Sequence, residues 1–275
     1  MIIFGVIFIN FGLVDFIEYN MRYSGSKAKI AKHIIPFIME ELKPGFKYIE
    51  PFVGGCNVID KVDWNHKVGY DLNGYVIALW NSMKMGLQGN IPKEVTEAQY
   101  AEMKELASKN SCSITYPRYL IGYVGNACSY GSAWFNGYAH INEKRGENHI
   151  KEAYNGFIKQ VNNFNNLYNT YFMRADYQEA IAMETDFGKN KNVVIYCDPP
   201  YKGTKGYKDG NFNSDEFWDF IRTYSKEGIK IFVSEYEAPD DFKCIWSMSR
   251  KDGMGTTHFG VKQNVKTERL FVYGG

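Results

Sequence analysis

The sequence lacks several features that would define its class at once. Its five cysteines are an odd number, and they include no Cys-x-x-Cys pair and no nearby histidine cluster. This usage is typical of reduced thiols in the cytoplasm and argues against a structural zinc, so we expect no metal. The Gly-x-Gly-x-x-Gly pattern of nicotinamide and flavin enzymes is also absent, which disfavours an oxidoreductase.

Net charge is small as well. The 275 residues carry 32 lysines and arginines against 31 acids, which gives a formal net charge of +1. Because no global basic field results, any contact with nucleic acid must come from local patches. Hydrophobic residues make up 45% of the chain and aromatic residues 16%. Such a chain can bury the core of one large domain, or of a domain with an inserted lobe.

Long apolar runs are scarce. Residues 1–16 are markedly apolar, but they include Asn10 and Asp15, are too few to cross a bilayer and lack the basic start of a signal peptide. We therefore expect no stable membrane association. Since Met21 directly precedes the first motif described below, residues 1–20 are interpreted as a dispensable N-terminal extension.

The most informative stretch runs from Val193 to Tyr201. Its β-branched apolar residues predict a buried strand that delivers Asp198 at its end. Pro199 and Pro200 exclude a helix there and make a stiff, outward-pointing turn. A carboxylate, two prolines and an aromatic ring at one point indicate a site, although a purely structural turn is the alternative.

Methylation of an exocyclic amino group is the chemistry that this turn suggests. The lone pair of adenine N6 is delocalised into the ring, and acceptors on both N–H bonds would favour a pyramidal nitrogen with a directed lone pair. The Asp198 carboxylate and the Pro199 carbonyl can be those acceptors, because the stiff turn aims them. Tyr201 would lie against the face of an extruded base, which has lost its stacking.

Two further strand ends carry candidate binding residues. A short strand ends at Glu50 and is followed by Gly54 and Gly55, whose lack of side chains lets the backbone approach a ligand closely. A second short strand, 68–71, ends in Asp71. An acid at this position of an α/β fold binds ribose hydroxyls, although an Asx-turn or an N-cap is the alternative.

Local signals predict several other elements. Ser26 is expected to cap a helix that runs to about Leu42, Thr96 to open a capping box, and Asn213 to cap a later helix. The apolar spacing within 147–168 predicts another helix. Strands are predicted at 229–234, 242–248 and 269–273.

Four stretches, taken in order, resemble a known family. They are Arg22–Lys27, Glu50–Gly55, Asp71–Asn73 and Asp198–Tyr201. With them the sequence is similar to the Dam-type, or alpha-group, DNA N6-adenine methyltransferases, especially phage and restriction-associated members. The resemblance implies the Rossmann-like α/β fold of S-adenosylmethionine-dependent methyltransferases. Its sheet would be mixed and mostly parallel, with an inserted, mainly helical target recognition lobe.

The resemblance also implies which residues bind S-adenosylmethionine. Tyr23 would pack on the cofactor, Lys27 would pair with its methionine carboxylate, and Asp176 would meet the amine of its adenine. For Asp176 a turn or N-cap role is the alternative. The full implied set is Tyr23, Lys27, Glu50, Phe52, Gly54, Asp71, Asp176 and Asp198. The chain has Gly54-Gly55-Cys56 where many members have Phe-x-Gly-x-Gly, so the shape of that turn is left open.

By the same resemblance the chain divides into an extension (1–20), a catalytic domain (21–85 and 171–275) and a target recognition lobe (86–170). Asparagine can bond adenine bidentately, aromatic rings can wedge into the space of a flipped base, and basic side chains can hold phosphates. The candidate DNA-binding residues are Arg118, Tyr130, Trp134, Asn136, Tyr138, Lys202, Lys205 and Lys208. The alternative is an aromatic core for the lobe and solvated lysines in a surface loop.

The implied function is site-specific methyl transfer from S-adenosylmethionine to adenine N6 in double-stranded DNA, with Asp198, Pro199, Pro200 and Tyr201 catalytic. Cytosine N4 or an RNA adenine as acceptor, and a catalytically silent DNA-binding module on the same fold, stay open as alternatives. The family setting implies the cytoplasm of a bacterial or phage-infected cell and allows a restriction endonuclease as counterpart. The oligomeric state is left open.

Overall fold

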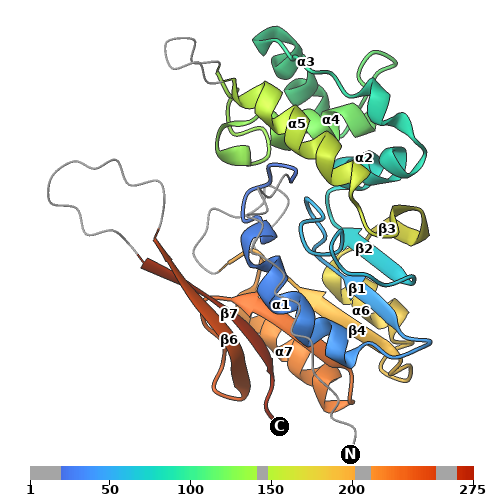
Figure 1. Ribbon diagram of the computed structural model, residues 1–275, viewed down its shortest axis with the longest axis vertical. Coiled ribbons are helices and arrows are strands. Elements are labelled where there is room, and N and C mark those ends of the chain that lie inside the picture. The colour runs from blue at the N-terminus through green and yellow to red at the C-terminus, as the bar shows by residue number, and fades with distance from the viewer. Residues whose placement is uncertain (1–19, 141–147, 202–211, 252–264) are drawn as a thin grey trace, which may run out of the picture.

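A mixed β-sheet forms the centre of the computed structural model, which describes residues 20–140, 148–201, 212–251 and 265–275 (Figure 1). Within these residues the sheet has seven strands in the order β3-β2-β1-β4-β5-β7-β6. Strands β3, β2, β1, β4 and β5 are parallel, and β7 is antiparallel to both β5 and β6. The strands are β1 (Lys47–Glu50), β2 (Lys67–Asp71), β3 (Thr170–Arg174), β4 (Val193–Cys197), β5 (Lys230–Glu235), β6 (Phe242–Lys251) and β7 (Val265–Tyr273). The predicted mixed, mostly parallel α/β sheet is confirmed.

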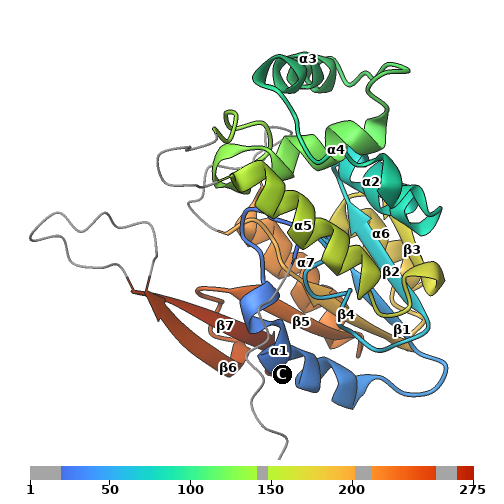
Figure 2. The same cartoon turned by 45° about the horizontal axis from the view of Figure 1, so that its top comes forward.

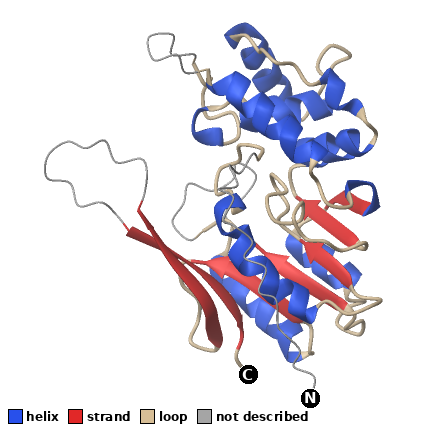
Figure 3. Ribbon diagram, in the orientation of Figure 1, coloured by secondary structure: helices blue, strands red, loops and turns tan. Residues whose placement is uncertain are grey.

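Helices cover both faces of the sheet. In Figure 1, α1 lies in front of it and α6 and α7 lie behind it, while α2 to α5 gather beyond one end of the strands. Figures 2 and 3 show the same grouping. The helices are α1 (Ala28–Glu41), α2 (Gly74–Lys84), α3 (Glu97–Ser108), α4 (Arg118–Ala127), α5 (His149–Asn162), α6 (Tyr177–Glu184) and α7 (Ser214–Lys226), with short 3-10 turns η1 (Leu87–Asn90), η2 (Tyr130–Ser132) and η4 (Leu167–Asn169). Of the helices in the described ranges, none has the length and apolar character needed to cross a membrane.

Side-chain caps fix where several helices begin. Thr96 forms the predicted capping box at α3, and Asn213 accepts hydrogen bonds from the first amides of α7, as expected. The prediction for α1 is wrong by one residue, because Lys27 rather than Ser26 occupies the cap position. The Ser26 hydroxyl instead accepts from the Ala28 amide at 3.2 Å. The helix predicted within 147–168 is shorter than expected and ends at Asn162.

Strand β4 is buried on both faces, as parallel strands between helical layers are. Val194 and Tyr196 belong to the hydrophobic cluster on the α1 face. Val193, Ile195 and Cys197 belong to the cluster on the opposite face, which α6 and α7 cover. Because successive residues of a strand point to opposite sides, one apolar run serves both cores. This burial anchors the turn that follows at Asp198.

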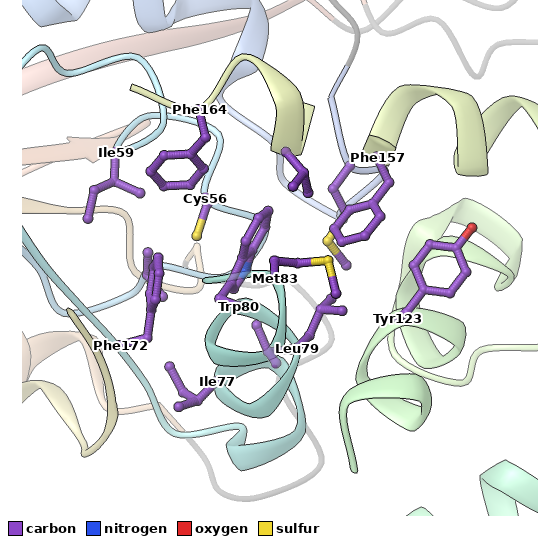
Figure 4. Close-up of a cluster of buried hydrophobic side chains, with 14 of the residues drawn as sticks. Cys56, Ile59, Ile77, Leu79, Trp80, Met83, Tyr123, Phe157, Phe164 and Phe172 are labelled. Atoms are coloured by element: carbon purple, nitrogen blue, oxygen red, sulfur yellow. The ribbon is translucent and has the colours of Figure 1, made fainter. Parts of the chain in front are cut away.

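The core on the α1 face continues into the helical lobe (Figure 4). The Trp80 ring of α2 packs against Phe157 of α5 at a centroid distance of 5.6 Å, and against Phe172 of β3 at 6.1 Å. Phe164, beyond the end of α5, lies 5.8 Å from the same indole. Buried aromatic pairs of this kind stabilise by both burial and ring geometry. The lobe is therefore joined to the sheet by continuous packing.

Helices α2 and α4 approach each other closely at Gly122. A Cβ atom at this position would lie 2.2 Å from the carbonyl oxygen of Tyr75, so only glycine fits. Helix α2 thus packs on the lobe although the sequence analysis assigns it to the catalytic domain. The lobe boundaries 86–170 stay a prediction.

The strand order reverses between β1 and β4, since the chain steps outward from β1 to β2 and β3, and from β4 to β5. In open α/β sheets ligands bind at this reversal, outside the carboxyl ends of the strands. Glu50 and Asp71 end β1 and β2, and Asp198 directly follows β4. The fold thereby brings three predicted site residues to one edge of the sheet.

Candidate active site

Lys27 and Asp198 form an ion pair at this edge. The Lys27 Nζ lies 3.1 Å from Asp198 Oδ1 and donates a hydrogen bond to the Gly25 carbonyl at 2.9 Å. It also lies 4.3 Å from the centre of the Tyr201 ring, and only 4% of the lysine is exposed. The resemblance implied a cofactor carboxylate as the partner of Lys27. In this structure its partner is the acid of the Asp-Pro-Pro-Tyr turn.

The Asp198 carboxyl group is partly withdrawn from water, with 23% of its side chain exposed. Burial raises its pKa to about 6, although the Lys27 ammonium opposes the shift and Glu268 adds to it. At neutral pH the group is therefore ionised. An ionised carboxylate accepts hydrogen bonds only, which is what an amine donor requires.

Glu268 completes this cluster, and the sequence analysis did not single it out. It lies on β7, its Oε2 accepts a hydrogen bond from the Tyr201 hydroxyl at 2.7 Å, and the same oxygen is 3.9 Å from Lys27 Nζ. The Tyr201 ring is also packed edge-on against Tyr236, at a centroid distance of 4.4 Å. A single acidic residue in a strand of alternating polar and apolar residues gives no local sign that it contacts Tyr201 and Lys27.

Asp71 braces the glycine turn. Its Oδ2 accepts from the Gly54 amide at 3.0 Å and its Oδ1 from the Asn73 amide at 2.8 Å. The bond to Asn73 is the Asx-type interaction that stood as the alternative to ribose binding. Burial raises the pKa of Asp71 to about 6, and the two amide bonds oppose the shift. The same carboxylate thus joins β2 to the turn that follows β1.

Tyr23 lies directly against the two glycines. A Cβ atom on Gly54, whose φ is +43°, would lie 2.7 Å from the Tyr23 ring, and one on Gly55 would lie 2.7 Å from the Tyr23 Cβ. The Gly54 carbonyl accepts from the Trp80 indole at 3.0 Å, which fixes the turn to the core. Side chains at these two positions would displace Tyr23, so the sequence Gly54-Gly55 is required by the packing.

Gln160 is a second residue that the sequence analysis missed. From α5 its amide nitrogen donates to the carbonyls of Gly55 at 3.0 Å and Cys56 at 3.2 Å, and to Asp60 Oδ2 at 3.0 Å. Its amide oxygen accepts from the Met21 amide at 2.7 Å, and only 2% of the residue is exposed. A polar residue on the apolar face of a helix is the one signal that could have revealed it.

Glu50, at the end of β1, is buried. It is 3% exposed and accepts a hydrogen bond from the Tyr48 hydroxyl at 2.6 Å. Burial raises the pKa of Glu50 well above its usual range, and the Tyr48 bond opposes this. The side chain is therefore held by a residue of its own strand.

Phe52 and Asp176 have structural partners of their own. The Phe52 ring stacks on Tyr177 at 5.5 Å and meets Phe217 edge-on at 5.9 Å, within the core beneath α6 and α7. The exposed Asp176 caps α6, with its Oδ1 accepting from the Glu179 amide at 2.8 Å. The N-cap interaction given as the alternative for Asp176 is thus present.

Two candidate DNA-binding residues of the lobe are engaged within it. The Arg118 guanidinium donates to Asn110 Oδ1 at 2.7 Å and lies 4.5 Å from the centre of the Tyr75 ring. Trp134 packs against the same ring at 5.8 Å. These contacts match the aromatic lobe core that was the alternative interpretation.

The other candidates differ in exposure. Tyr138 donates to the Val95 carbonyl at 2.6 Å and packs on Tyr100, whereas Tyr130 is 68% exposed and Asn136 is exposed. Lys202, Lys205 and Lys208 lie outside the described residues. Among the described residues, no group of three or more His, Cys, Asp or Glu side chains is arranged to hold a metal ion.

The mostly parallel sheet, the acids at its carboxyl edge and the Asp-Pro-Pro-Tyr turn are the features expected of an α/β methyltransferase that acts on an amino group. Comparison with known families makes this specific, because the model of the D12 class N6 adenine-specific DNA methyltransferases matches residues 23–250. The chain belongs to this family. Its activity is N6-adenine methylation of DNA, and a methyltransferase of this family uses S-adenosylmethionine as methyl donor.

Several characterised proteins are similar over much of the chain. The Retron Ec67 DNA adenine methylase of Escherichia coli is 26% identical over 262 residues, which cover 88% of this chain and 82% of that protein. The DNA adenine methylase of Salmonella typhi is 25% identical over 194 residues, 66% of this chain and 64% of that protein. The type II methyltransferase M.FokI of Planomicrobium okeanokoites is 24% identical over 211 residues, 72% of this chain but 31% of that longer protein.

Proposed function

We propose that adenine N6 is methylated at the Asp198–Tyr201 turn, in double-stranded DNA and at a specific site. The observation that carries this proposal is the ion pair between Lys27 and Asp198, 3.1 Å apart, since it joins the first family motif to the last in one place. Lys27 Nζ also lies 4.3 Å from the centre of the Tyr201 ring. A ring at this point suits a base that has left its stack.

The turn supplies the hydrogen-bond acceptors that the reaction needs. Asp198 accepts one N–H of the target amine and the Pro199 carbonyl accepts the other, which directs the nitrogen lone pair outward. Pro200 keeps the turn stiff, and Tyr201 lies against the base. Because the pKa of Asp198 is about 6, its carboxylate is ionised at neutral pH, and Lys27 contacts only one of its two oxygens.

The residues around the glycine turn fit S-adenosylmethionine. Asn57 Oδ1 is buried and has no hydrogen-bond partner among the described residues, and the Asn57 amide lies beside Gly55. A buried acceptor without a donor is rare in folded proteins, and a cofactor amino group would satisfy it. We propose that Tyr23, Gly54 and Asp71 bind the cofactor here. The wider proposed set adds Lys27, Glu50, Phe52, Asp176 and Asp198.

When bound, S-adenosylmethionine supplies a methyl group on a sulfonium, which is already electrophilic. A direct displacement on that carbon requires alignment and acceptors rather than further activation. We therefore propose a reaction that proceeds without metal and without a covalent enzyme intermediate. Undiminished turnover in the presence of a chelator is the expected result.

DNA contact is proposed for the lobe formed by residues 86–170, inserted between the two parts of the catalytic domain, 21–85 and 171–275. Tyr130 and Asn136 support it, since both are exposed on the segment between α4 and α5. The remaining proposed contacts are Arg118, Trp134, Tyr138, Lys202, Lys205 and Lys208. Residues 1–20 are proposed to be dispensable.

We propose that the protein works in the cytoplasm of a bacterial or phage-infected cell. We also propose that a restriction endonuclease is its counterpart. The support is the similarity to M.FokI, a type II methyltransferase. If the proposal is correct, DNA from cells that express the chain resists an endonuclease that cuts the methylated site. DNA that is methylated but cut by every endonuclease with an overlapping site would contradict it.

Digestion of treated DNA to nucleosides, followed by mass spectrometry, tests the reaction directly. N6-methyl-2′-deoxyadenosine that appears with wild-type protein and is absent with Asp198→Ala is the expected result. Methylated cytosine, or methylation of RNA alone, would instead support the alternative acceptors. No methylated nucleoside at all, with S-adenosylmethionine still bound, would contradict the proposed catalytic turn.

A further inference from the structure

Glu268 reaches the candidate active site from β7, in the antiparallel part of the sheet. It lies on β7 opposite Met248 of β6, far along the sequence from the turn that it contacts. Its side chain is 14% exposed. An acid that is this well enclosed requires partners, and those found here, Tyr201 and Lys27, both belong to the proposed catalytic cluster.

Two carboxylates share one ammonium in this cluster. Lys27 Nζ lies 3.1 Å from Asp198 and 3.9 Å from Glu268, and a third donor position is taken by the Gly25 carbonyl at 2.9 Å. The shorter contact shows that Asp198 holds the lysine more closely. A small side-chain movement would bring the Lys27 ammonium within hydrogen-bond distance of Glu268 instead of Asp198.

The contact between Lys27 and Asp198 competes with the target amine for one of the two carboxylate oxygens. Asp198 must accept a hydrogen bond from the target amine, but one of its oxygens already faces the lysine. A lysine without an alternative partner would resist leaving, since a buried ammonium requires compensation. A second carboxylate within reach removes this obstacle.

We propose that Glu268 is a positioning residue of the methyl-transfer site. It fixes the Tyr201 ring through its hydroxyl, and it receives Lys27 when Asp198 turns to the target adenine. This inference rests on the proposed function of the Asp198–Tyr201 turn, and it adds a residue to that turn from a strand distant in sequence.

The two parts of the role can be separated by two substitutions. Glu268→Gln keeps an oxygen that can accept from Tyr201 but removes the charge that attracts Lys27. Tyr201→Phe keeps the ring and the Glu268 charge but removes the hydroxyl. Thr267→Val is the control, because Thr267 is the neighbour of Glu268 on β7 and its hydroxyl bonds to Ser249 of β6 instead.

The pH profile distinguishes positioning from a structural role. Asp198 is faced by Lys27, Glu268 and Tyr201, and, from deeper in the sheet, by Glu50 and Tyr196. Glu268 raises the pKa of Asp198, so removing its charge lowers that pKa. The acid limb of kcat/KM, which reports the free enzyme, should then move to lower pH in Glu268→Gln.

The test measures kcat/KM for DNA against pH at saturating S-adenosylmethionine, with cofactor affinity and Tm for each protein. Glu268→Gln should lose roughly tenfold or more in kcat/KM at neutral pH, the loss typical of a charged hydrogen-bonding partner. Its acid limb should move to lower pH, with cofactor affinity within about twofold. Tyr201→Phe should lose activity with the limb unmoved, and Thr267→Val should match wild type.

Wild-type kcat/KM with an unmoved limb in Glu268→Gln would overturn the proposal. A loss of activity with an unmoved limb and a lowered Tm would assign Glu268 a structural role only, which also overturns it. Failure of wild-type protein to methylate DNA would instead contradict the proposed function. The activity of the wild-type protein therefore distinguishes failure of the Glu268 proposal from failure of the proposed function.

Discussion

Lys27 and Asp198 are far apart within the matched family region, 23–250, and meet in the structure with 3.1 Å between Nζ and Oδ1. Lys27 precedes α1, and Asp198 follows β4, the central strand. The fold therefore assembles the candidate site from residues that are distant in sequence.

Substitution of Asp198 should abolish methyl transfer. Asp198→Ala removes the proposed acceptor of the target amine, and we expect a loss of roughly 100-fold or more in kcat, typical of a group that stabilises the transition state. Asp198→Asn keeps one acceptor oxygen and should retain more activity than alanine. Cofactor affinity, measured by calorimetry, should stay measurable in both. Full turnover by the alanine variant would exclude the proposed mechanism.

Replacement of Gln160 should lower the stability of the fold. Gln160→Leu leaves the carbonyls of Gly55 and Cys56 without their buried donor, and each unsatisfied group costs about 1–3 kcal/mol. We expect the free energy of unfolding to fall by roughly 2–4 kcal/mol in urea titrations. Gln178→Leu, which loses one exposed bond to Glu216, is the matched control and should change it by less than about 0.5 kcal/mol. Equal effects of the two variants would contradict the assigned role.

Gly54→Ala should displace Tyr23 and reduce affinity for S-adenosylmethionine. The new methyl group would lie 2.7 Å from the tyrosine ring, at a residue with φ of +43°. Positive φ and overpacking each cost about 1–3 kcal/mol. Gly89→Ala is the control, because no atom lies within 4 Å of a Cβ there. If calorimetry gives the same cofactor affinity for both variants, Tyr23 does not contact the cofactor.

Asp71 should make stability depend on pH. Its folded pKa of about 6 exceeds the ordinary value of 3.8, so between these values the folded state binds a proton that the unfolded state has lost. Stability contributed by this group is therefore present at low pH and is lost as the pH rises through about 6. Relative to Asp71→Asn, wild type should lose roughly 2–3 kcal/mol between pH 4 and pH 7. A difference between the two proteins that stays constant with pH would refute this.

Much of the fold is predictable because its signals are local. The apolar run of β4 and the caps at Thr96 and Asn213 need only a few neighbouring residues, and each is found where the sequence predicts it. The positions at which strands begin and end depend on residues that are more distant in the sequence. The strand predicted at 269–273 extends back to Val265 in the structure, because pairing with β6 rather than hydrophobicity sets its length.

The candidate site is only partly predictable for the same reason. The Asp198 turn and the glycine turn carry their own chemistry in a few consecutive residues. Glu268 and Gln160 acquire their positions through β7 and α5, and neither has a distinctive neighbour in sequence. The pairing of Lys27 with Asp198 likewise depends on how α1 packs on the sheet, which no short motif encodes.

Mapping of modified bases in DNA from cells that express this chain tests the central claim most directly. Nanopore sequencing reports the modified base and its context together, and cells with Asp198→Ala provide the reference. We predict N6-methyladenine at one recurring sequence in the wild-type sample and none in the reference. Identical maps from the two samples, with both proteins folded and able to bind S-adenosylmethionine, would contradict the account.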